Sequence, residues 1–144
     1  MKGYAKASSF EKVVTILILD DEFDLVTILK HGLEIQGFRV FSFTDPFLAL
    51  EHFKINAFNY NLVISDLRMP GLNGLELLKK VKDSNPKVRT ILMSAYNFEE
   101  DDLFQKYVKE GVIDSTIEKP VTIHRLCQRV KDELEVYNST SHGN

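Results

Sequence analysis

Short apolar runs alternate along this chain with segments in which apolar residues recur every three or four positions. The first run, residues 13–19, is β-branched and almost wholly apolar, which is typical of a central parallel strand covered on both faces. Similar runs occur at residues 39–43, 62–66, 88–93 and 115–118, with turn-forming residues between them. The pattern therefore predicts five strands.

A segment with helical periodicity follows each run. Asp45 before Pro46 suits a helix N-terminus, Asn73 opens another helix, the fourth helix is expected at residues 99–109, and Gly37 and Gly111 each end a helix. The apolar positions expected to face the core at helical spacing are Leu25, Ile28, Leu29, Leu33, Phe47, Leu50, Phe53, Leu75, Leu78, Val81, Leu103, Phe104, Tyr107, Val108, Ile123, Leu126, Cys127, Val130 and Leu134.

The alternation of strand and helix predicts an α/β fold with right-handed crossovers, a doubly wound five-stranded parallel sheet. The chain has 144 residues, which suits one domain. We expect this domain at residues 12–137, between flexible polar tails at residues 1–11 and 138–144.

The composition and charge of the chain argue against several classes of function. The net charge of −3 argues against direct binding of nucleic acid, which would need a basic surface. No apolar run approaches the ~20 residues of a membrane span, and the first residues lack the apolar core of a signal peptide. With one cysteine the chain cannot form an internal disulfide. We therefore expect a cytoplasmic protein without a membrane segment.

Reactive side chains follow four of the five expected strands. Asp20 and Asp21 follow the first, Asp66 ends the third, Ser94 ends the fourth, and Lys119 follows the fifth. Taken singly, each suits an ordinary role such as a helix cap, a turn or a solvated side chain. Parallel strands, however, bring their carboxyl ends to one edge, where ligands bind in open α/β sheets. The joint pattern predicts a functional site there.

Three carboxylates at one edge repel one another unless a cation joins them. Mg²⁺ prefers oxygen ligands and retains several waters, so it could bind these acids and still accept phosphate oxygens. Asp66 could then attack phosphorus and form an acyl phosphate. Lys119 would offset charge on the phosphoryl oxygens, and Ser94 could donate a hydrogen bond to one of them.

These residues resemble the receiver domain of two-component response regulators, over residues 13–136. The resemblance rests on the combination and order of Asp20-Asp21, Asp66-Leu67-Arg68-Met69-Pro70-Gly71 with Gly74, Met93-Ser94-Ala95 and Lys119-Pro120. It implies a flavodoxin-like (βα)5 fold with strand order 2-1-3-4-5.

The resemblance also implies a function. A histidine kinase or phosphotransfer protein would phosphorylate Asp66, and Mg²⁺ would be held by Asp20, Asp21, Asp66 and the backbone carbonyl of Arg68. Phosphorylation would draw the Ser94 hydroxyl inward and rearrange the face formed by the fourth helix, fifth strand and fifth helix, where a downstream protein would bind. We expect a stand-alone phosphorylation-driven switch without a catalytic activity beyond its own phosphotransfer and dephosphorylation.

The sequence departs from this family at one switch position. The aromatic residue usually found three positions before the lysine is replaced by Thr116. The conformational signal is then expected to pass through Ser94 and the segment after it. Arg68 and Tyr96, each two residues after a site residue, have long polar-tipped side chains. We expect them to flank the path of the attacking water and to slow hydrolysis of the acyl phosphate.

Two other functions are compatible with parts of this pattern. One is a phosphatase that works through an aspartyl phosphate, but this chemistry normally needs an acid two residues after the nucleophile, where Arg68 stands. The other is a degenerate receiver that serves only as a binding scaffold, which the complete acid set and Lys119 oppose.

Other polar residues carry weaker signals. The acidic residues 99–102 could form a second metal site, but they better fit the first turn of a helix. Cys127 lies on an apolar helical stripe and is expected to be a buried thiol. The four histidines show no metal-ligand spacing and are expected at the surface, namely His31, His52, His124 and His142.

Overall fold

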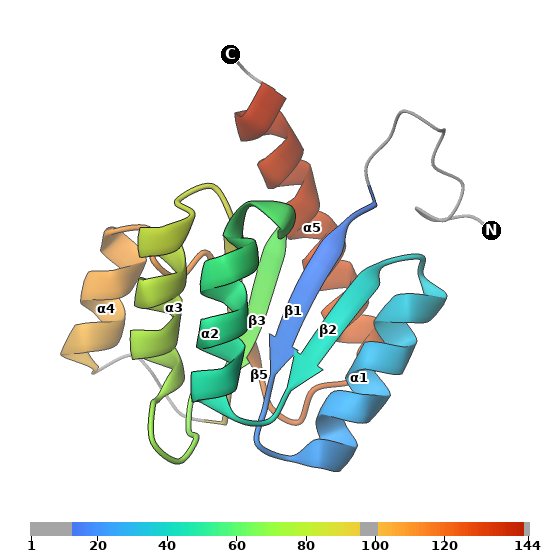
Figure 1. Cartoon of the computed structure of the whole chain (residues 1–144), viewed down its shortest axis with the longest axis horizontal. Coiled ribbons are helices and arrows are strands. Elements are labelled where there is room, and N and C mark those ends of the chain that lie inside the picture. The colour runs from blue at the N-terminus through green and yellow to red at the C-terminus, as the bar shows by residue number, and fades with distance from the viewer. Residues whose placement is uncertain (1–12, 96–100, 143–144) are drawn as a thin grey trace.

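The computed structural model describes residues 13–95 and 101–142, with side chains up to residue 139. Its sheet is five-stranded and parallel, with the order β2-β1-β3-β4-β5 that the resemblance implies (Figure 1). The strands are β1 (Thr15–Leu19), β2 (Arg39–Phe43), β3 (Leu62–Asp66), β4 (Arg89–Ser94) and β5 (Ser115–Glu118). The predicted fold class is therefore confirmed, and the strand order reverses between β1 and β3.

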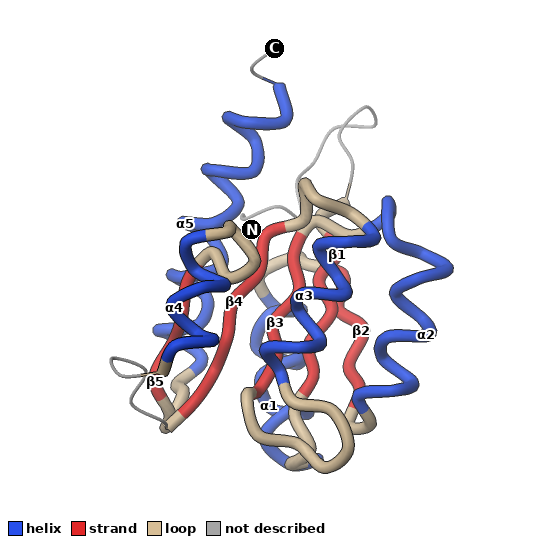
Figure 2. The backbone as a smooth tube through the Cα atoms, turned by 90° about the vertical axis from the view of Figure 1, so that its left-hand side faces the viewer, coloured by secondary structure: helices blue, strands red, loops and turns tan. Residues whose placement is uncertain are grey.

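The helices cover both faces of the sheet. They are α1 (Phe23–Ile35), α2 (Pro46–Asn56) with the short 3-10 helix η2 (Ala57–Asn59), α3 (Gly74–Ser84), α4 (Asp102–Lys109) and α5 (Ile123–His142). Apolar residues of α1 and α5 pack on one face, and those of α2, α3 and α4 pack on the other. Figure 2 looks onto the sheet from the side of α2, α3 and α4, and it shows the last turns of α5 projecting past the strands.

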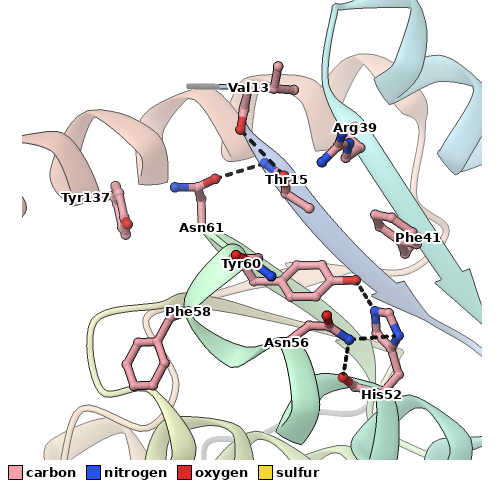
Figure 3. A pocket seen from close by; sticks show the side chains of 11 residues that line it. Val13, Thr15, Arg39, Phe41, His52, Asn56, Phe58, Tyr60, Asn61 and Tyr137 are labelled. Carbon is pink, nitrogen blue, oxygen red and sulfur yellow. Dashed lines mark hydrogen bonds between the residues drawn. The ribbon is translucent and has the colours of Figure 1, made fainter. Parts of the chain in front are cut away.

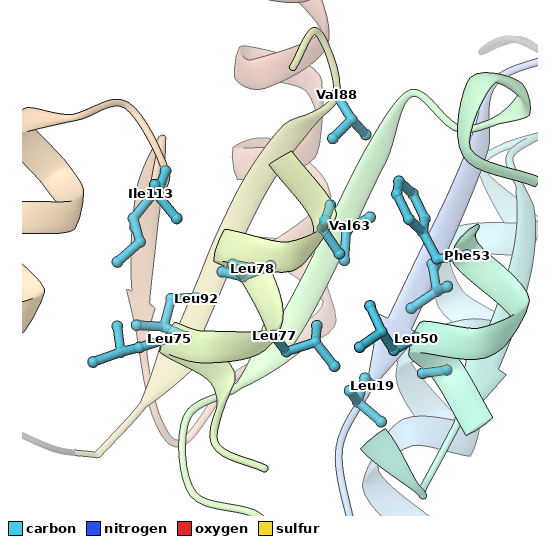
Figure 4. Close-up of a cluster of buried hydrophobic side chains, with 14 of the residues drawn as sticks. Leu19, Leu50, Phe53, Val63, Leu75, Leu77, Leu78, Val88, Leu92 and Ile113 are labelled. Carbon is cyan, nitrogen blue, oxygen red and sulfur yellow. The ribbon is translucent and has the colours of Figure 1, made fainter. Parts of the chain in front are cut away.

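The two cores follow from the alternation of side chains along each strand. In β1, Leu17 and Leu19 point to the core beneath α2 and α3, whereas Ile16 and Ile18 point to the core beneath α1 and α5. Figure 4 shows the first of these cores, in which Phe53 packs near the sheet. A strand that is buried on both sides needs apolar residues at every position, which explains the continuous apolar run of β1.

Side-chain caps fix where three helices begin. Asp45 Oδ1 accepts a hydrogen bond from Phe47 N at 2.8 Å, and Asn73 Oδ1 accepts one from Glu76 N at 3.0 Å. Both caps were predicted. Asp101 caps α4 through Phe104 N at 2.8 Å, so this helix begins at Asp102 rather than at the predicted residue 99.

Several expectations about the core and boundaries are wrong. Ile28, Phe47 and Val108 were expected to face the core but are 63%, 57% and 42% exposed, because the faces of α1, α2 and α4 that carry them do not contact the sheet. The first strand begins at Thr15, two residues later than predicted. The helix α5 continues to His142 through part of the expected C-terminal tail. The expected N-terminal tail lies outside the described residues.

Candidate functional site

Hydrogen bonds between neighbouring strands align the strand ends that carry the predicted site. Asp66 pairs in register with Met93, and the next residue along, Leu67, donates its N–H to Met93 O at 2.9 Å. The Lys119 N–H donates to Ser94 O at 3.0 Å just beyond β5. Because all five strands are parallel, these contacts bring Asp20, Asp66, Ser94 and Lys119 to one edge of the sheet.

Three carboxylates meet at this edge, as predicted. One oxygen from each of Asp20, Asp21 and Asp66 lies within 4.8 Å of the others. Asp20 is 0% exposed and Asp66 is 5% exposed, whereas Asp21 faces solvent. Asp20 Oδ1 accepts a hydrogen bond from Glu22 N at 2.9 Å, which fixes the orientation of this carboxylate.

Lys119 connects the two buried acids. Its Nζ lies 2.9 Å from Asp20 Oδ2 and 3.1 Å from Asp66 Oδ1. A third carboxylate, Glu22 Oε1, lies 3.5 Å away. Sequence reasoning missed the contact with Glu22, although three consecutive acids after β1 were a signal for it.

Burial and charge act in opposite directions on the pKa values of this cluster. Burial is the main reason that the pKa of Asp66 is raised, the Asp20 charge adds to this rise, and the Lys119 hydrogen bond opposes it. Burial alone would lower the pKa of Lys119, but its hydrogen bonds to Asp20 and Asp66 outweigh that effect and raise it. Lys119 is therefore a permanent cation between the two acids.

The loop after β3 passes very close to Asp66. A Cβ atom at Gly74 would collide with the backbone oxygen of Asp66, so only glycine fits there. The Gly74 N–H donates to Leu67 O at 2.8 Å and closes the loop. The backbone at Gly71, within the same loop, has a φ of +93°, which also favours glycine.

A cavity of about 320 Å³ lies over the cluster, lined by Asp66, Arg68, Ser94, Ala95 and Lys119. Ser94 is buried at the end of β4, whereas Arg68 is exposed. Tyr96, expected to flank the site, lies outside the described residues. The cavity thus combines the carboxylate, hydroxyl and ammonium groups that phosphoryl chemistry needs.

The donor set at this edge fits Mg²⁺. All three side chains that converge are carboxylates, and oxygen is the ligand atom that Mg²⁺ prefers. The buried Asp20 Oδ2 has the ammonium of Lys119 beside it, and it retains acceptor capacity for a second cation. Asp21 is exposed, so a bound ion could keep part of its water shell.

The other described residues that the sequence suggested as functional do not line this cavity. Thr116 is half-buried on β5, and its carbonyl accepts a hydrogen bond from Arg129 of α5. Of the acidic segment, Asp101 caps α4 and Asp102 lies in its first turn, as the helical interpretation predicts, while residues 99 and 100 lie outside the described part. Cys127 is buried, as expected.

The histidine expectation is wrong at one position. His31 and His124 are exposed, and the side chain of His142 lies outside the described residues. His52, by contrast, is half-buried, and its Nε2 lies 2.6 Å from the Tyr60 hydroxyl. A pairing between α2 and the segment before β3 leaves no periodic signal in the sequence.

The fold and the acid site together define a flavodoxin-like α/β domain with an aspartate at its strand switch point. A family model for the response regulator receiver domain matches residues 16–131. This chain belongs to that family. Receiver domains are signalling phosphoacceptor domains of two-component systems, and they bind Mg²⁺ at an acidic pocket.

Similar proteins differ in how much surrounds this domain. The transcriptional regulatory protein ZraR of Klebsiella oxytoca is 34% identical over 121 residues, covering 84% of this chain but only 26% of the regulator. The sporulation initiation phosphotransferase F of Bacillus subtilis is 29% identical over 83% of this chain and 92% of its own length. The chain thus spans about a quarter of the first relative and nearly all of the second.

Solved receiver structures agree with the fold. A receiver domain protein from Methanospirillum hungatei superposes with a TM-score of 0.80 at 26% identity, covering 90% of this chain and 99% of the other. One from Clostridium thermocellum gives a TM-score of 0.78 at 26% identity, covering 88% and 98%. Within the described part of the chain, no helix is both long and apolar enough to cross a membrane.

Proposed function

We propose that this chain is a phosphorylation switch whose acceptor is Asp66. The observation that carries the proposal is the position of Lys119 Nζ, 2.9 Å from Asp20 Oδ2 and 3.1 Å from Asp66 Oδ1. A lysine held against the acceptor carboxylate can follow the charge that develops on an incoming phosphoryl group. Membership of the receiver family supports the same assignment.

The proposed reaction moves a phosphoryl group from a phosphohistidine to Asp66. A carboxylate oxygen of Asp66 forms an O–P bond while the N–P bond to the donor imidazole breaks, and the released imidazole nitrogen takes up a proton from solvent. The product is an acyl phosphate on Asp66. Hydrolysis of this acyl phosphate, with water attacking phosphorus, returns the carboxylate and inorganic phosphate.

Each neighbouring side chain has a separate role in this reaction. Lys119 stabilises negative charge on the phosphoryl oxygens, for which its raised pKa keeps it protonated. Ser94, buried at the end of β4 and lining the same cavity, donates a hydrogen bond to one of those oxygens. Asp20, Asp21, Asp66 and the Arg68 carbonyl would hold Mg²⁺. When bound, the ion supplies neutralisation of charge on the phosphoryl oxygens.

We further propose that the phosphodonor is a histidine kinase or a histidine phosphotransfer protein, and that a downstream protein binds the face of α4, β5 and α5. Related proteins support two settings for such a domain, because the Bacillus phosphotransferase is nearly the same length and the Klebsiella regulator is much longer. A stand-alone switch is the setting we propose here.

Acetyl phosphate labelling tests the acceptor. The wild-type chain with Mg²⁺ should gain the mass of one phosphoryl group, and Asp66→Asn should gain none, because an amide has the shape of the acid but is not a nucleophile. Asp83→Asn, which changes an exposed acid on α3, is the control and should be labelled at the wild-type rate. Wild-type labelling of Asp66→Asn would place the acceptor elsewhere.

Magnesium binding has its own test. Titration with Mg²⁺ should shift the backbone amide resonances around Asp20, Asp21 and Asp66 at millimolar concentrations, typical of a weakly held, partly hydrated ion. Asp21→Asn should weaken the response while leaving the buried acids in place. Shifts centred on Asp101 and Asp102 instead would contradict the assigned ligands.

A further inference from the structure

A second cavity, of about 470 Å³, lies at the edge of the sheet opposite the acid cluster (Figure 3). Its lining comes from the start of β1, from β2, from the end of α2 with η2, and from Tyr137 near the end of α5. The volume falls within the range of about 300–1,000 Å³ that is usual for small-molecule sites. The receiver reaction does not use any of these residues.

The floor of this cavity is built from fixed polar groups. The Tyr60 hydroxyl, on a residue that is 2% exposed, lies 2.6 Å from His52 Nε2. Asn56 Nδ2 donates to His52 O at 2.9 Å, one turn earlier in α2, which fixes the Asn56 amide beside this pair. Asn61 Oδ1 accepts from Thr15 N at 2.8 Å and fixes the opposite side. The cavity is therefore largely pre-formed, which lowers the entropic cost of binding.

The charge of the lining has one sign. Arg39 is its cation, and neither aspartate nor glutamate is among the described residues that line it. None of the ion pairs found in the described part of the chain involves Arg39. A cationic cavity in a chain of net charge −3 is suited to an anion rather than to a cation.

Aromatic rings form the walls. Phe41 lies two residues from Arg39 on β2, so both side chains are on the same face of the strand. Phe58 is 80% exposed and stands at the rim, where Figure 3 shows it across the cavity from Phe41. Exposed rings beside a fixed polar floor offer stacking surfaces for a planar ligand.

We propose that this cavity binds a small molecule in which an aromatic ring carries an anionic group such as a carboxylate. The ring packs on the aromatic lining to which Phe41 and Phe58 contribute, and the anion pairs with the Arg39 guanidinium, which matches a carboxylate with two parallel N–H donors. The Asn56 and Asn61 amides supply further polar contacts at the floor. This site is independent of phosphorylation at Asp66.

The test titrates phenylacetate into the full-length chain and follows backbone amide resonances by NMR. Saturable shifts are expected at residues 39–41 and 58–61, at low millimolar or tighter concentrations. Two matched probes separate the contributions: 2-phenylethanol keeps the ring without the charge, and cyclohexylacetate keeps the charge without the aromatic ring. Each should bind at least about fivefold more weakly, the scale of one lost charged or stacking contact.

Variants locate the site. Arg39→Gln should bring phenylacetate binding down to that of 2-phenylethanol, and Phe58→Ala should weaken it about fivefold. Both positions are exposed, so the fold should not change. Lys54→Gln and Ile55→Ala are the matched controls, because they remove a similar exposed charge and apolar side chain from α2 outside the cavity. Both controls should bind phenylacetate like the wild type.

Three results would overturn the proposal. The first is an absence of saturable shifts at the lining amides. The second is equal binding of all three probes, or equal binding by Arg39→Gln and the wild type. The third is a change of the same amides with protein concentration alone, which would assign the cavity to contacts with a second copy of the chain.

Discussion

At the scale of single residues, the position of Asp66 depends on a glycine eight residues away. The backbone oxygen of Asp66 occupies the space in which a Cβ of residue 74 would lie, and Leu92 Cδ1 is 2.9 Å from the same point. A backbone oxygen cannot move aside to relieve this clash as the end of a flexible side chain can. Any side chain at this position must therefore displace the end of β3 that carries the proposed acceptor.

Gly74→Ala should consequently cost about 1–3 kcal/mol of stability, the usual range for overpacking, and should slow phosphorylation by acetyl phosphate. Gly111→Ala is the matched control. Its Cβ would meet no atom within 4 Å, but its φ of +82° disfavours alanine by about 1–2 kcal/mol. Urea unfolding should show similar losses for both variants, and only Gly74→Ala should label slowly. Equal labelling of the two would contradict local displacement of Asp66.

Arg68 offers a second prediction at this scale. Its exposed side chain borders the cavity over Asp66, on the side from which water reaches phosphorus. Arg68→Ala should shorten the lifetime of the acyl phosphate by about two- to tenfold, since it removes a group that crowds or orders the attacking water. A dephosphorylation time course measures this, with Lys54→Ala, an exposed change on α2, as the control. An unchanged lifetime in Arg68→Ala would remove the gating role.

The convergence of the candidate site residues at one edge was predictable from the sequence, because strand ends follow a simple rule. In a parallel sheet every strand ends at the same edge, so the residues after β1, β3, β4 and β5 had to converge. The contact between Lys119 and Glu22 was beyond that rule, because it depends on how a loop side chain turns. The His52–Tyr60 pair was missed for a similar reason, since it depends on how a side chain of α2 meets the segment before β3.

At the scale of elements, partly buried ion pairs join α3 and α5 to the starts of β4 and β5. Asp114 Oδ2 lies 2.8 Å from Lys82 Nζ and also accepts from Thr90 N at 2.9 Å. Arg89 reaches Asp114 at 3.5 Å and Glu133 at 2.9 Å. One carboxylate before β5 is therefore shared by a helix and by the neighbouring strand.

Asp114→Asn should cost about 3 kcal/mol or more, because it leaves the charge of Lys82 poorly paired in a partly buried place. Asp83→Asn is a matched control, since Asp83 also lies 2.8 Å from a lysine, Lys79. The side chains are 12% and 10% exposed in the first pair and 40% and 61% in the second. Because solvent screens the exposed pair, the second loss should be several times smaller than the first. Equal losses in urea unfolding would contradict this account.

Side chains of α5 cover the outer edge of strand β5. The carbonyl groups of Thr116 and Glu118 point away from β4, because the alternate residues of a parallel strand bond to opposite sides. Arg129 donates to Thr116 O, and Arg125 donates to Glu118 O at 3.2 Å. These arginines satisfy acceptors at which another strand could pair. A partner that binds this face would therefore meet side chains rather than an open strand edge.

Helix boundaries were predictable where a side chain caps them and were less so elsewhere. Asp45 and Asn73 cap the N-termini of α2 and α3, as their residue types predicted. Ile28 and Phe47 fit the apolar spacing yet face outward, because periodicity fixes a stripe on the helix but does not fix its width. The end of α5 was missed because its last residues are polar and lie beyond the sheet, where no apolar pattern marks them.

At the scale of the whole molecule, the acid cluster and the cavity lined by Arg39, Phe41 and Phe58 lie at opposite edges of one sheet. The fold was predictable because five alternations of strand and helix allow few other arrangements. The cavity was not, since its lining comes from four separate segments that meet only in the folded chain. The route by which phosphorylation changes the surface is also a property of the assembled sheet.

That route should begin at Ser94. Its backbone oxygen accepts from Lys119 N at 3.0 Å, so the end of β4 is bonded to the residue that follows β5. A hydroxyl that bonds to the phosphoryl group in only one state gives the two states different contacts, which a switch requires. Thr116 is half-buried, and its side chain is too small to serve as an aromatic switch.

Ser94→Ala should therefore retain phosphorylation at Asp66 but lose most of the amide shifts that phosphorylation causes over α4, β5 and α5. Thr116→Ala should leave both the labelling and the shifts as in the wild type, because the threonine side chain is not expected to move between states. Comparing NMR spectra of each variant before and after acetyl phosphate measures this. Full shifts in Ser94→Ala, or their loss in Thr116→Ala, would place the origin of the signal on β5 instead of at the end of β4.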